Sequence, residues 1–294
     1  TGMLDLDALE EMMSDETAGL MVTNPNTLGI FNSHIARLCE IAHRHDALVY
    51  YDGANLNAVL GKFRPGDAGV DVMHVNLHKT FATPHGGGGP GAGPVGVREA
   101  LRGYLPTSIV VKRSDNTYTL DYEREKSIGY IAPFYGNFAV LLKAYAYVLL
   151  LGAEGLVEVS ENAVLNANYL MHELKEVFEL PYDRTCMHEF VLSASRQAGQ
   201  DVRAIDVAQA LIDEGFHPPT VYFPLIVKEA MMIEPTETES KEMLDAFAAA
   251  LRRIARTAAS DPESLRAAPR STPVGRPDEV KAAKTMDFAY SGEC

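Results

Sequence analysis

The sequence has no tryptophan and only three cysteines, Cys39, Cys186 and Cys294, in 294 residues. Three widely spaced thiols do not build a disulfide framework, so we expect a reducing, cytoplasmic location. A metal-ligand spacing is also lacking. The one grouping of suitable residue types, Cys39 with His43 and His45, falls in a segment of helical polarity, so we expect no metal.

Basic residues are scarce as well. Lysine and arginine number 26 against 40 aspartates and glutamates, which gives a formal net charge of −14. Such a chain repels phosphate backbones and anionic lipid, so we expect neither a nucleic-acid nor a membrane partner. The longest apolar stretch, residues 139–153, contains Lys143 and falls short of the roughly 20 residues of a membrane span. We expect it to form a buried helix.

The composition is that of a globular protein, with 47% hydrophobic and 22% charged residues. Its length favours two domains, which we place at residues 1–150 and 151–294. Short β-branched and aromatic runs alternate with helical segments, so the fold class is α/β, with a parallel or mixed sheet in the first domain. The predicted strands cover residues 20–23, 48–51, 71–77, 95–97, 189–193, 221–223 and 225–227. The predicted helices cover 30–45, 136–151, 154–179 and 240–257.

Lys79 is the most informative residue, because it ends an apolar strand-like run and precedes a glycine-rich loop at residues 85–94. A lysine that forms a Schiff base needs a dry pocket and space for a bulky partner. Asn24 and Asp52 also follow predicted strands, with Asn55 close behind. Ligands of such sheets bind at the carboxyl ends of the strands, so we expect these side chains to meet in one crevice.

Pyridoxal phosphate suits this combination. The cofactor needs a lysine for its imine and an acid that keeps its ring nitrogen protonated, and Lys79 and Asp52 match these demands. Each residue also has an ordinary structural explanation, since Asp52-Gly53 is a common turn pair. Nucleotide binding fits less well, because the glycine loop lacks the Lys-Ser/Thr pair of a P-loop and contains Pro90 and Pro94.

Several longer motifs resemble the P-protein of the glycine cleavage system, glycine dehydrogenase (decarboxylating), in the form called subunit 2. The resemblance covers nearly the whole chain. The motifs are MVTNPNTLG at residues 21–29, YDGANLN at 51–57, NLHKTF at 76–81, MHEFVLS at 187–193, HPPTVYFP at 217–224, IEPTETES at 233–240 and TPV at 272–274.

The resemblance implies a fold-type-I, aspartate aminotransferase-like enzyme, with pyridoxal 5'-phosphate bound to Lys79 as a Schiff base. Asp52 would face the pyridine nitrogen, and His78 and Thr80 would lie near the cofactor. The implied reaction decarboxylates glycine and passes the aminomethyl group to the oxidised lipoyl group of H-protein. A hetero-oligomer with P-protein subunit 1 is also implied.

The departing lipoyl sulfur requires a proton donor with a pKa near neutrality. The candidates are His78, His85, His188 and His217. We favour His85, because a glycine-rich loop can open for the incoming lipoyl arm.

One departure from the family concerns the start of the chain, which lies just ahead of the strand before Asn24. Family members have a long preceding stretch that holds the phosphate loop and the residue stacked on the ring. We therefore expect a truncated large domain followed by a small C-terminal α/β domain with a tail. Two alternatives stay open: another fold-type-I decarboxylase or aminotransferase, and a non-catalytic fragment or subunit that needs a partner. Arg113 and Arg184 are the candidate clamps for a substrate carboxylate.

Overall fold

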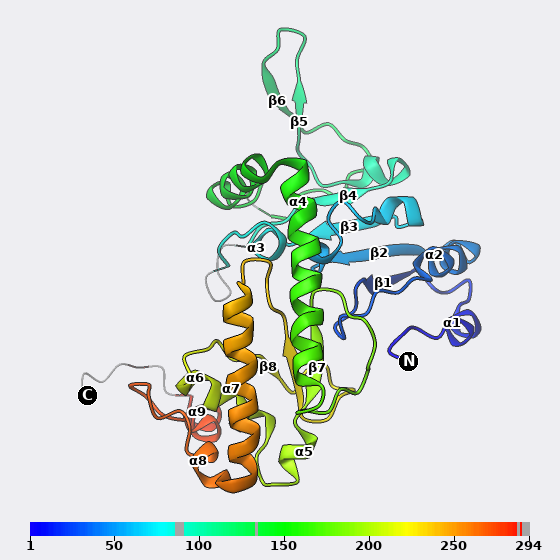
Figure 1. The fold of residues 1–294 in the computed structure, drawn as a ribbon. Coiled ribbons are helices and arrows are strands. Elements are labelled where there is room, and N and C mark those ends of the chain that lie inside the picture. Colours follow the sequence, from blue (N-terminus) through cyan, green and yellow to red (C-terminus); the bar gives the residue numbers. More distant parts are fainter. Residues whose placement is uncertain (86–90, 133–134, 287–288, 290–294) are drawn as a thin grey trace. The chain divides into compact units, whose positions relative to one another are not determined.

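The computed structural model describes residues 1–85, 91–132, 135–286 and 289 (Figure 1). The chain divides into two units, each with its own packed interior. The first contains Thr1–Tyr169, Arg184–Phe190 and Glu234–Glu239, and the second contains Leu170–Asp183, Val191–Ile233 and Ser240–Cys294. The boundary that we predicted at residue 150 therefore lies inside the first unit, which also takes in two short segments from later in the chain.

A four-stranded mixed sheet forms the centre of the first unit. Its strands are β1 (Gly19–Thr23), β2 (Leu48–Gly53), β3 (Val72–Val75) and β4 (Val95–Val97), in that spatial order. The first three are parallel and β4 runs antiparallel to β3. The prediction of a parallel or mixed sheet is confirmed, and each of the four predicted strands lies within two residues of its observed position.

The predicted helix at residues 30–45 is shorter in the structure, where α2 spans Ile35–Arg44. The five preceding residues form a loop, because the backbone of Asn32 is bonded to the side chain of Asn24. Ile35, Leu38 and Ile41 recur at helical spacing and are buried against β2. The remaining helical elements of this unit are short: α1 (Leu6–Met12), α3 (Leu77–Thr80) and the 3-10 turns Leu56–Ala58, Pro65–Ala68 and Glu99–Tyr104.

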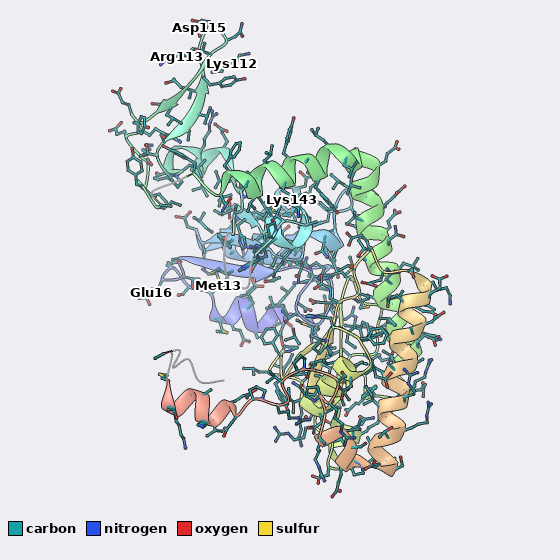
Figure 2. All side chains as sticks on the ribbon, turned by 90° about the vertical axis from the view of Figure 1, so that its left-hand side faces the viewer. Met13, Glu16, Lys112, Arg113, Asp115 and Lys143 are labelled. Atoms are coloured by element: carbon teal, nitrogen blue, oxygen red, sulfur yellow. The ribbon has the colours of Figure 1, made fainter. Side chains whose placement is uncertain are left out.

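An antiparallel hairpin of β5 (Ile109–Lys112) and β6 (Tyr118–Asp121) projects from the first unit. Figure 2 labels Lys112, Arg113 and Asp115 near its tip. This position separates Arg113 from the four-stranded sheet (Figures 1 and 2).

The long helix α4 (Phe138–Leu174) follows the hairpin and turns non-helical at Gly152, with φ 64° and ψ −170°. We predicted a buried helix at residues 139–153, and the prediction of burial is wrong. Val140 and Ala144 pack with Leu77, but Leu149 is 63% and Leu150 83% exposed. The segment is apolar on all sides, so one packed face leaves the others open.

By length and composition α4 is able to cross a membrane, with 11% of its apolar window buried. Gly152 interrupts it, however. The apolar part before this break, residues 138–151, is shorter than the roughly 20 residues that a span requires.

The second unit contains a three-stranded sheet of β7 (Phe190–Ser193), β9 (Ala230–Ile233) and β8 (Thr220–Val221), in that order. Its helices are α5 (Ser195–Ala198), α6 (Ala204–Asp213), α7 (Lys241–Ser260), α8 (Pro262–Arg266) and α9 (Glu279–Thr285). The strand predicted at residues 225–227 is wrong, since Leu225 and Ile226 are exposed and irregular. The central strand is β9, whose sequence AMMI is poor in the β-branched residues that mark a strand.

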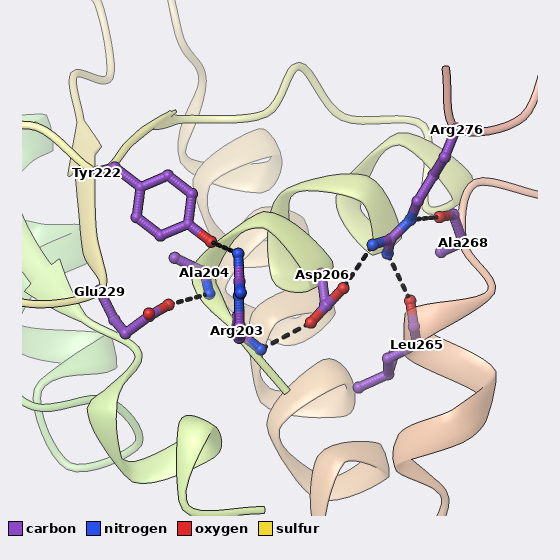
Figure 3. A network of polar contacts seen from close by, with 8 residues as sticks. All are labelled: Arg203, Ala204, Asp206, Tyr222, Glu229, Leu265, Ala268 and Arg276. Carbon is purple, nitrogen blue, oxygen red and sulfur yellow. Dashed lines mark hydrogen bonds and ion pairs between the residues drawn. The ribbon is translucent and has the colours of Figure 1, made fainter. Parts of the chain in front are cut away.

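The C-terminal tail is fastened to α6 by a network of polar contacts (Figure 3). The Arg276 guanidinium donates to Asp206 Oδ1 at 2.7 Å and to the carbonyl oxygens of Ala268 and Leu265. Asp206 Oδ2 accepts the backbone N–H of Arg203 at the start of the helix. The side chain of Asp206 therefore caps α6 and also holds the tail.

Asp71, just before β3, joins three parts of the first unit. The carboxylate accepts the Val49 N–H at 2.8 Å, and it contacts His43 Nε2 at 2.8 Å and Arg98 at 3.0 Å. Burial alone raises the pKa of Asp71, but the bonds from His43, Val49 and Arg98 bring that pKa below its ordinary value. The ionised form of Asp71 is thus favoured in the folded state.

We predict that Asp71→Asn lowers the free energy of unfolding by about 1–3 kcal/mol, because a neutral amide cannot accept all three donors. Urea unfolding at neutral pH measures the change. Asp67→Asn is the matched control, since the Asp67 side chain is 65% exposed and pairs with Arg64, which is also exposed. Equal losses in the two variants would contradict this account of Asp71.

Candidate active site

Polar side chains of the first unit gather at the carboxyl ends of the parallel strands β1, β2 and β3. In the ladder, Thr23 of β1 is paired with Asp52 of β2, and Asp52 is paired with His74 of β3. Asn24 follows this row directly, and Lys79 follows β3 on the one-turn helix α3. The sheet thus places Asp52 near the end of β2, and Asn24 and Lys79 after the ends of the neighbouring parallel strands β1 and β3.

Asp52 is held in position by its neighbours while one oxygen stays accessible. Its Oδ1 accepts the N–H of Ala54 at 2.9 Å and lies 3.3 Å from His74 Nε2. Within the described part of the chain both contacts fall on Oδ1, and the side chain is 36% exposed. Oδ2 is therefore available to accept a donor from a ligand.

His74 orients Asp52, and we did not predict its role. The Tyr50 hydroxyl lies 2.7 Å from His74 Nδ1, and the two rings are 5.7 Å apart. If Tyr50 donates to Nδ1, the proton of the neutral imidazole is on Nε2, which lies 3.3 Å from both Asn76 Oδ1 and Asp52 Oδ1. The sequence shows that Tyr50 and Asp52 are two residues apart on one strand and so lie on the same face. Only the strand register shows that His74 lies next to them.

Lys79 is exposed, whereas Leu77 and Thr80 on the same short helix are buried. The buried pair anchors α3, so the lysine extends from a fixed backbone. The ring of His78 meets that of His85 edge-on, with the centroids 4.2 Å apart. Burial, His85 and Lys79 all lower the pKa of His78, which favours a neutral imidazole beside the lysine.

Unsatisfied polar atoms flank Lys79 and test whether the site fits pyridoxal phosphate. Among the described residues, His78 Nδ1, Thr80 Oγ1 and Thr83 Oγ1 are buried without a hydrogen-bond partner. Such atoms are costly unless a ligand or water satisfies them. A phosphate ester with several acceptor oxygens meets this need, so the residues present fit the cofactor. Of the glycine loop that we predicted to border it, residues 86–90 lie outside the described chain.

The two asparagines that we predicted as cofactor ligands bond to neighbouring loops. Asn24 is fully buried, with its amide donating to the Asn32 carbonyl at 3.2 Å and accepting the Asn32 N–H at 2.8 Å. Asn55 Nδ2 donates to the Pro25 carbonyl at 2.9 Å. These bonds fix the loops around Asp52, and contact with the cofactor stays a prediction for both residues.

The structure adds a buried polar cluster that we did not predict as a unit, made of His188, Glu189 and Glu234. His188 Nε2 lies 3.8 Å from Glu189 Oε1 and 3.8 Å from Glu234 Oε1. One polar atom of each side chain lies within 4.8 Å of the other two. Glu234 comes from a segment far along the chain from the adjacent His188 and Glu189, so no local pattern predicts their meeting.

Burial is the largest cause of the pKa shifts in this cluster. Desolvation, followed by the charge of Glu234, raises the pKa of Glu189 to about 8, against an opposing effect of Lys79. Desolvation and then Lys79 lower the pKa of His188 to about 3. At neutral pH the imidazole is thus uncharged and Glu189 carries a proton for much of the time. The charge of Lys79 acts on all three residues.

The remaining candidates from the sequence are His217, Arg113 and Arg184. His217 is exposed and belongs to the second unit. Arg113 bonds to Thr119 on the hairpin, and Arg184 donates to the carbonyl of Thr1. The structure therefore gives neither arginine a described contact with the row formed by Thr23, Asp52 and His74.

Comparisons with known proteins agree with this geometry. A family model described as glycine dehydrogenase, C-terminal domain, matches residues 159–269, and one described as aminotransferase class-V matches residues 1–108. A probable glycine dehydrogenase (decarboxylating) subunit 2 from Caldanaerobacter subterraneus subsp. tengcongensis is 58% identical over 96% of this chain and 58% of its own length. The corresponding protein of Oceanobacillus iheyensis is 55% identical over 98% of this chain and 59% of its own.

This chain is a relative of the glycine dehydrogenases called subunit 2. The resemblance predicted from the motifs is thereby confirmed. The chain spans about three fifths of the length of these relatives. Their designation as a second subunit implies a partner subunit.

Solved structures confirm the predicted fold. The glycine decarboxylase (P-protein) of the glycine cleavage system, in inhibitor-bound form, matches with a TM-score of 0.68 and 25% identity, over 82% of this chain and 56% of that one. An apo cysteine desulfurase from Thermococcus onnurineus NA1 matches with a TM-score of 0.65 and 16% identity, over 87% and 64%, and shows the fold alone. The fold is that of the fold-type-I enzymes, and pyridoxal phosphate is the cofactor of this family.

We predict that Tyr50→Phe weakens binding of pyridoxal phosphate about five- to tenfold. Loss of the hydroxyl removes the bond that fixes the His74 tautomer, and one such bond contributes about 1 kcal/mol. Absorbance titration with the cofactor measures the affinity. Tyr118→Phe on the exposed hairpin is the control, and an equal effect of both substitutions would contradict the orienting role of His74.

Proposed function

We propose that the protein decarboxylates glycine with pyridoxal phosphate and transfers the aminomethyl group to the oxidised lipoyl group of H-protein, with release of carbon dioxide. The observation that carries this proposal is that Asp52 lies near the end of β2 and Lys79 follows the neighbouring strand β3, between His78 and Thr80 with their unsatisfied polar atoms. The names of the relatives support the choice of glycine as substrate.

Lys79, Asp52 and His74 have separate roles in this proposal. Lys79 would supply the amine that holds the cofactor covalently, and Asp52 would accept from its protonated ring nitrogen. When bound, the cofactor supplies an electron sink for the carbon that loses its carboxylate. His74 would help to position Asp52, because its Nε2 lies 3.3 Å from the other carboxylate oxygen, Oδ1.

Transfer to the lipoyl group requires a proton at the departing sulfur. His85 is our candidate donor, since it is exposed and its ring lies against His78, next to Lys79. A hetero-oligomer with subunit 1 completes the proposed assembly. We also propose a cytoplasmic location, which agrees with the free thiols of Cys39 and Cys186.

A related reaction is the second candidate, because a fold-type-I decarboxylase or aminotransferase uses the same lysine and acid with a small free acceptor. Assays of the assembled enzyme with and without lipoylated H-protein separate the two. Turnover of glycine that depends on lipoylated H-protein supports the proposal, and equal turnover without it supports the alternative.

We predict that Lys79→Ala abolishes the covalent cofactor complex, because no other side chain supplies its amine at this position. Borohydride reduction of the protein with pyridoxal phosphate, followed by mass spectrometry, detects the complex in the parent protein. Lys281→Ala, at an exposed lysine of α9, is the control and leaves the labelled peptide unchanged. A labelled complex in Lys79→Ala would refute the assignment.

We predict that Asp52→Asn reduces decarboxylation about a hundredfold or more while some cofactor is retained. The carboxylate would keep the ring nitrogen of the bound cofactor protonated, which its action as an electron sink requires, and a neutral amide would not do so. Release of labelled carbon dioxide from glycine measures the rate, and cofactor absorbance measures occupancy. Turnover close to that of the parent enzyme would exclude this role for Asp52.

A further inference from the structure

His188, Glu189 and Glu234 form a polar cluster within the first unit. His188 is 1% and Glu189 3% exposed. His188 Nε2 lies 3.8 Å from Glu189 Oε1 and also 3.8 Å from Glu234 Oε1. These separations are too long for hydrogen bonds, so the imidazole and the two carboxyl groups face one another without satisfying one another.

Three buried polar atoms at this cluster have no hydrogen-bond partner among the described residues. They are His188 Nδ1, Glu189 Oε1 and Asn57 Oδ1. Asn57 adjoins the cluster, because its Nδ2 donates to Glu234 Oε1 at 3.2 Å. The unsatisfied oxygen of Glu189 is the one that faces His188 Nε2, so it points into the cluster. Buried atoms of this kind cost free energy unless a ligand, a proton or water satisfies them.

The backbone that carries His188 and Glu189 is fixed against the loop after β1. The Met187 N–H donates to the Gly29 carbonyl at 2.6 Å. Gly29 has φ +72°, and a Cβ there would lie 1.7 Å from the Glu189 carbonyl oxygen. Only glycine permits this approach, so the loop and the segment before β7 are locked together.

Helix α4 fixes the other two segments of the cluster. The Ser160 hydroxyl donates to the carbonyl oxygen of Asn57 at 2.7 Å. Asn166 Nδ2 donates to the carbonyl oxygen of Thr236, two residues after Glu234, at 2.9 Å. All of these residues belong to the first unit. The side chains of the cluster therefore extend from backbone that is already held in place, as a ligand site requires.

The donor atoms suit a zinc ion. Zinc binds imidazole nitrogen and carboxylate oxygen at about 2.0–2.2 Å, which places two ligand atoms of a tetrahedral ion roughly 3.4 Å apart. The separations of 3.8 Å around His188 Nε2 need only a small contraction to reach this value. One polar atom of each of the three side chains lies within 4.8 Å of the other two. The imidazole favours zinc over magnesium, which prefers oxygen ligands alone.

Asn57 is placed to supply a fourth ligand. A half-turn of its amide exchanges Nδ2 with Oδ1, and the oxygen then takes the position 3.2 Å from Glu234 Oε1. This distance suits two ligands of one tetrahedral ion. The nitrogen and the oxygen of an amide are nearly equal in size, so the turn needs no other movement. A divalent ion also balances the charge of two carboxylates, which a buried pair otherwise cannot carry at low cost.

We propose that His188, Glu189 and Glu234, with Asn57 as the fourth ligand, bind one zinc ion that joins three segments of the first unit. A proton held by Glu189 in the ion-free protein passes to solvent when the Oε1–zinc bond forms. The Glu234 side chain is 44% exposed and provides the approach from solvent. Our expectation of no metal concerned a different group, around Cys39. The proposal involves neither glycine nor the cofactor.

The direct test is calorimetric titration of the assembled protein with Zn²⁺. We expect one ion per chain in the parent protein, and an affinity at least about tenfold lower in Glu189→Gln and in Glu234→Gln, since each substitution removes a ligand. Glu239→Gln is the matched control, because Glu239 is an exposed glutamate of the same unit. The amide is isosteric, and Glu234 is partly exposed, so at least one variant keeps the fold.

Equal affinity of the parent and both cluster variants would overturn the proposal, as would a parent protein that binds no Zn²⁺. In that case a proton on Glu189 alone relieves the repulsion. Binding of Mg²⁺ as tight as that of Zn²⁺ would overturn the choice of zinc.

X-ray absorption of the zinc-loaded protein identifies the ligands. We expect nitrogen or oxygen neighbours at about 2.0–2.2 Å with the scattering of one imidazole. A sulfur neighbour at about 2.3 Å would assign the ion to a cysteine instead and overturn the proposal.

Thermal unfolding supplies a further readout. Zn²⁺ at a hundred times its Kd should raise the midpoint of the parent protein and of Glu239→Gln by roughly 4–8 °C, because the ion binds the folded state. The midpoint of Glu189→Gln should stay nearly unchanged. Equal shifts in the three proteins would contradict binding at the cluster. None of these measurements uses glycine turnover, so an inactive enzyme refutes the proposed function alone.

Discussion

The parallel pairing of β1, β2 and β3 is the constraint on which the site depends. The ladder pairs Thr23 with Asp52 and Asp52 with His74, so these three residues lie side by side near the carboxyl ends of the strands. Side chains alternate along β2, with Tyr51 buried and Asp52 accessible. A shift of one residue would exchange their faces and place the carboxylate in the core. The packing of Tyr51 against the α2 side of the sheet thus also secures the position of Asp52.

The first unit creates two different environments for carboxyl groups. Asp52 receives hydrogen bonds and keeps contact with solvent, which suits an anion. Glu189 is enclosed beside Glu234 and lacks a described partner on Oε1, which suits a neutral acid. The close approach at Gly29 makes the second environment possible.

The errors of sequence interpretation have physical causes. Residues 138–151 are apolar, and an apolar helix is normally buried, yet most of its surface is open in the described chain. Hydrophobicity predicts that an apolar helix face is removed from water, but it does not predict whether residues of the same unit pack against that face. Residues 225–227 include the β-branched Ile226 and Val227 but follow Pro224, which lacks an N–H for a ladder, and the strand forms at the less obvious Ala230–Ile233.

The sequence by itself determined the alternation of strands and helices and the resemblance to the P-protein, because each depends on residues close together in the chain, and it predicted that Lys79 and Asp52 serve one site. Tertiary structure alone decided that His74 orients Asp52, that Asn24 bonds the loop at Asn32, and that Glu189 meets Glu234. These contacts join residues from separate segments, and burial, which sets the protonation of Glu189, exists only after the segments have packed.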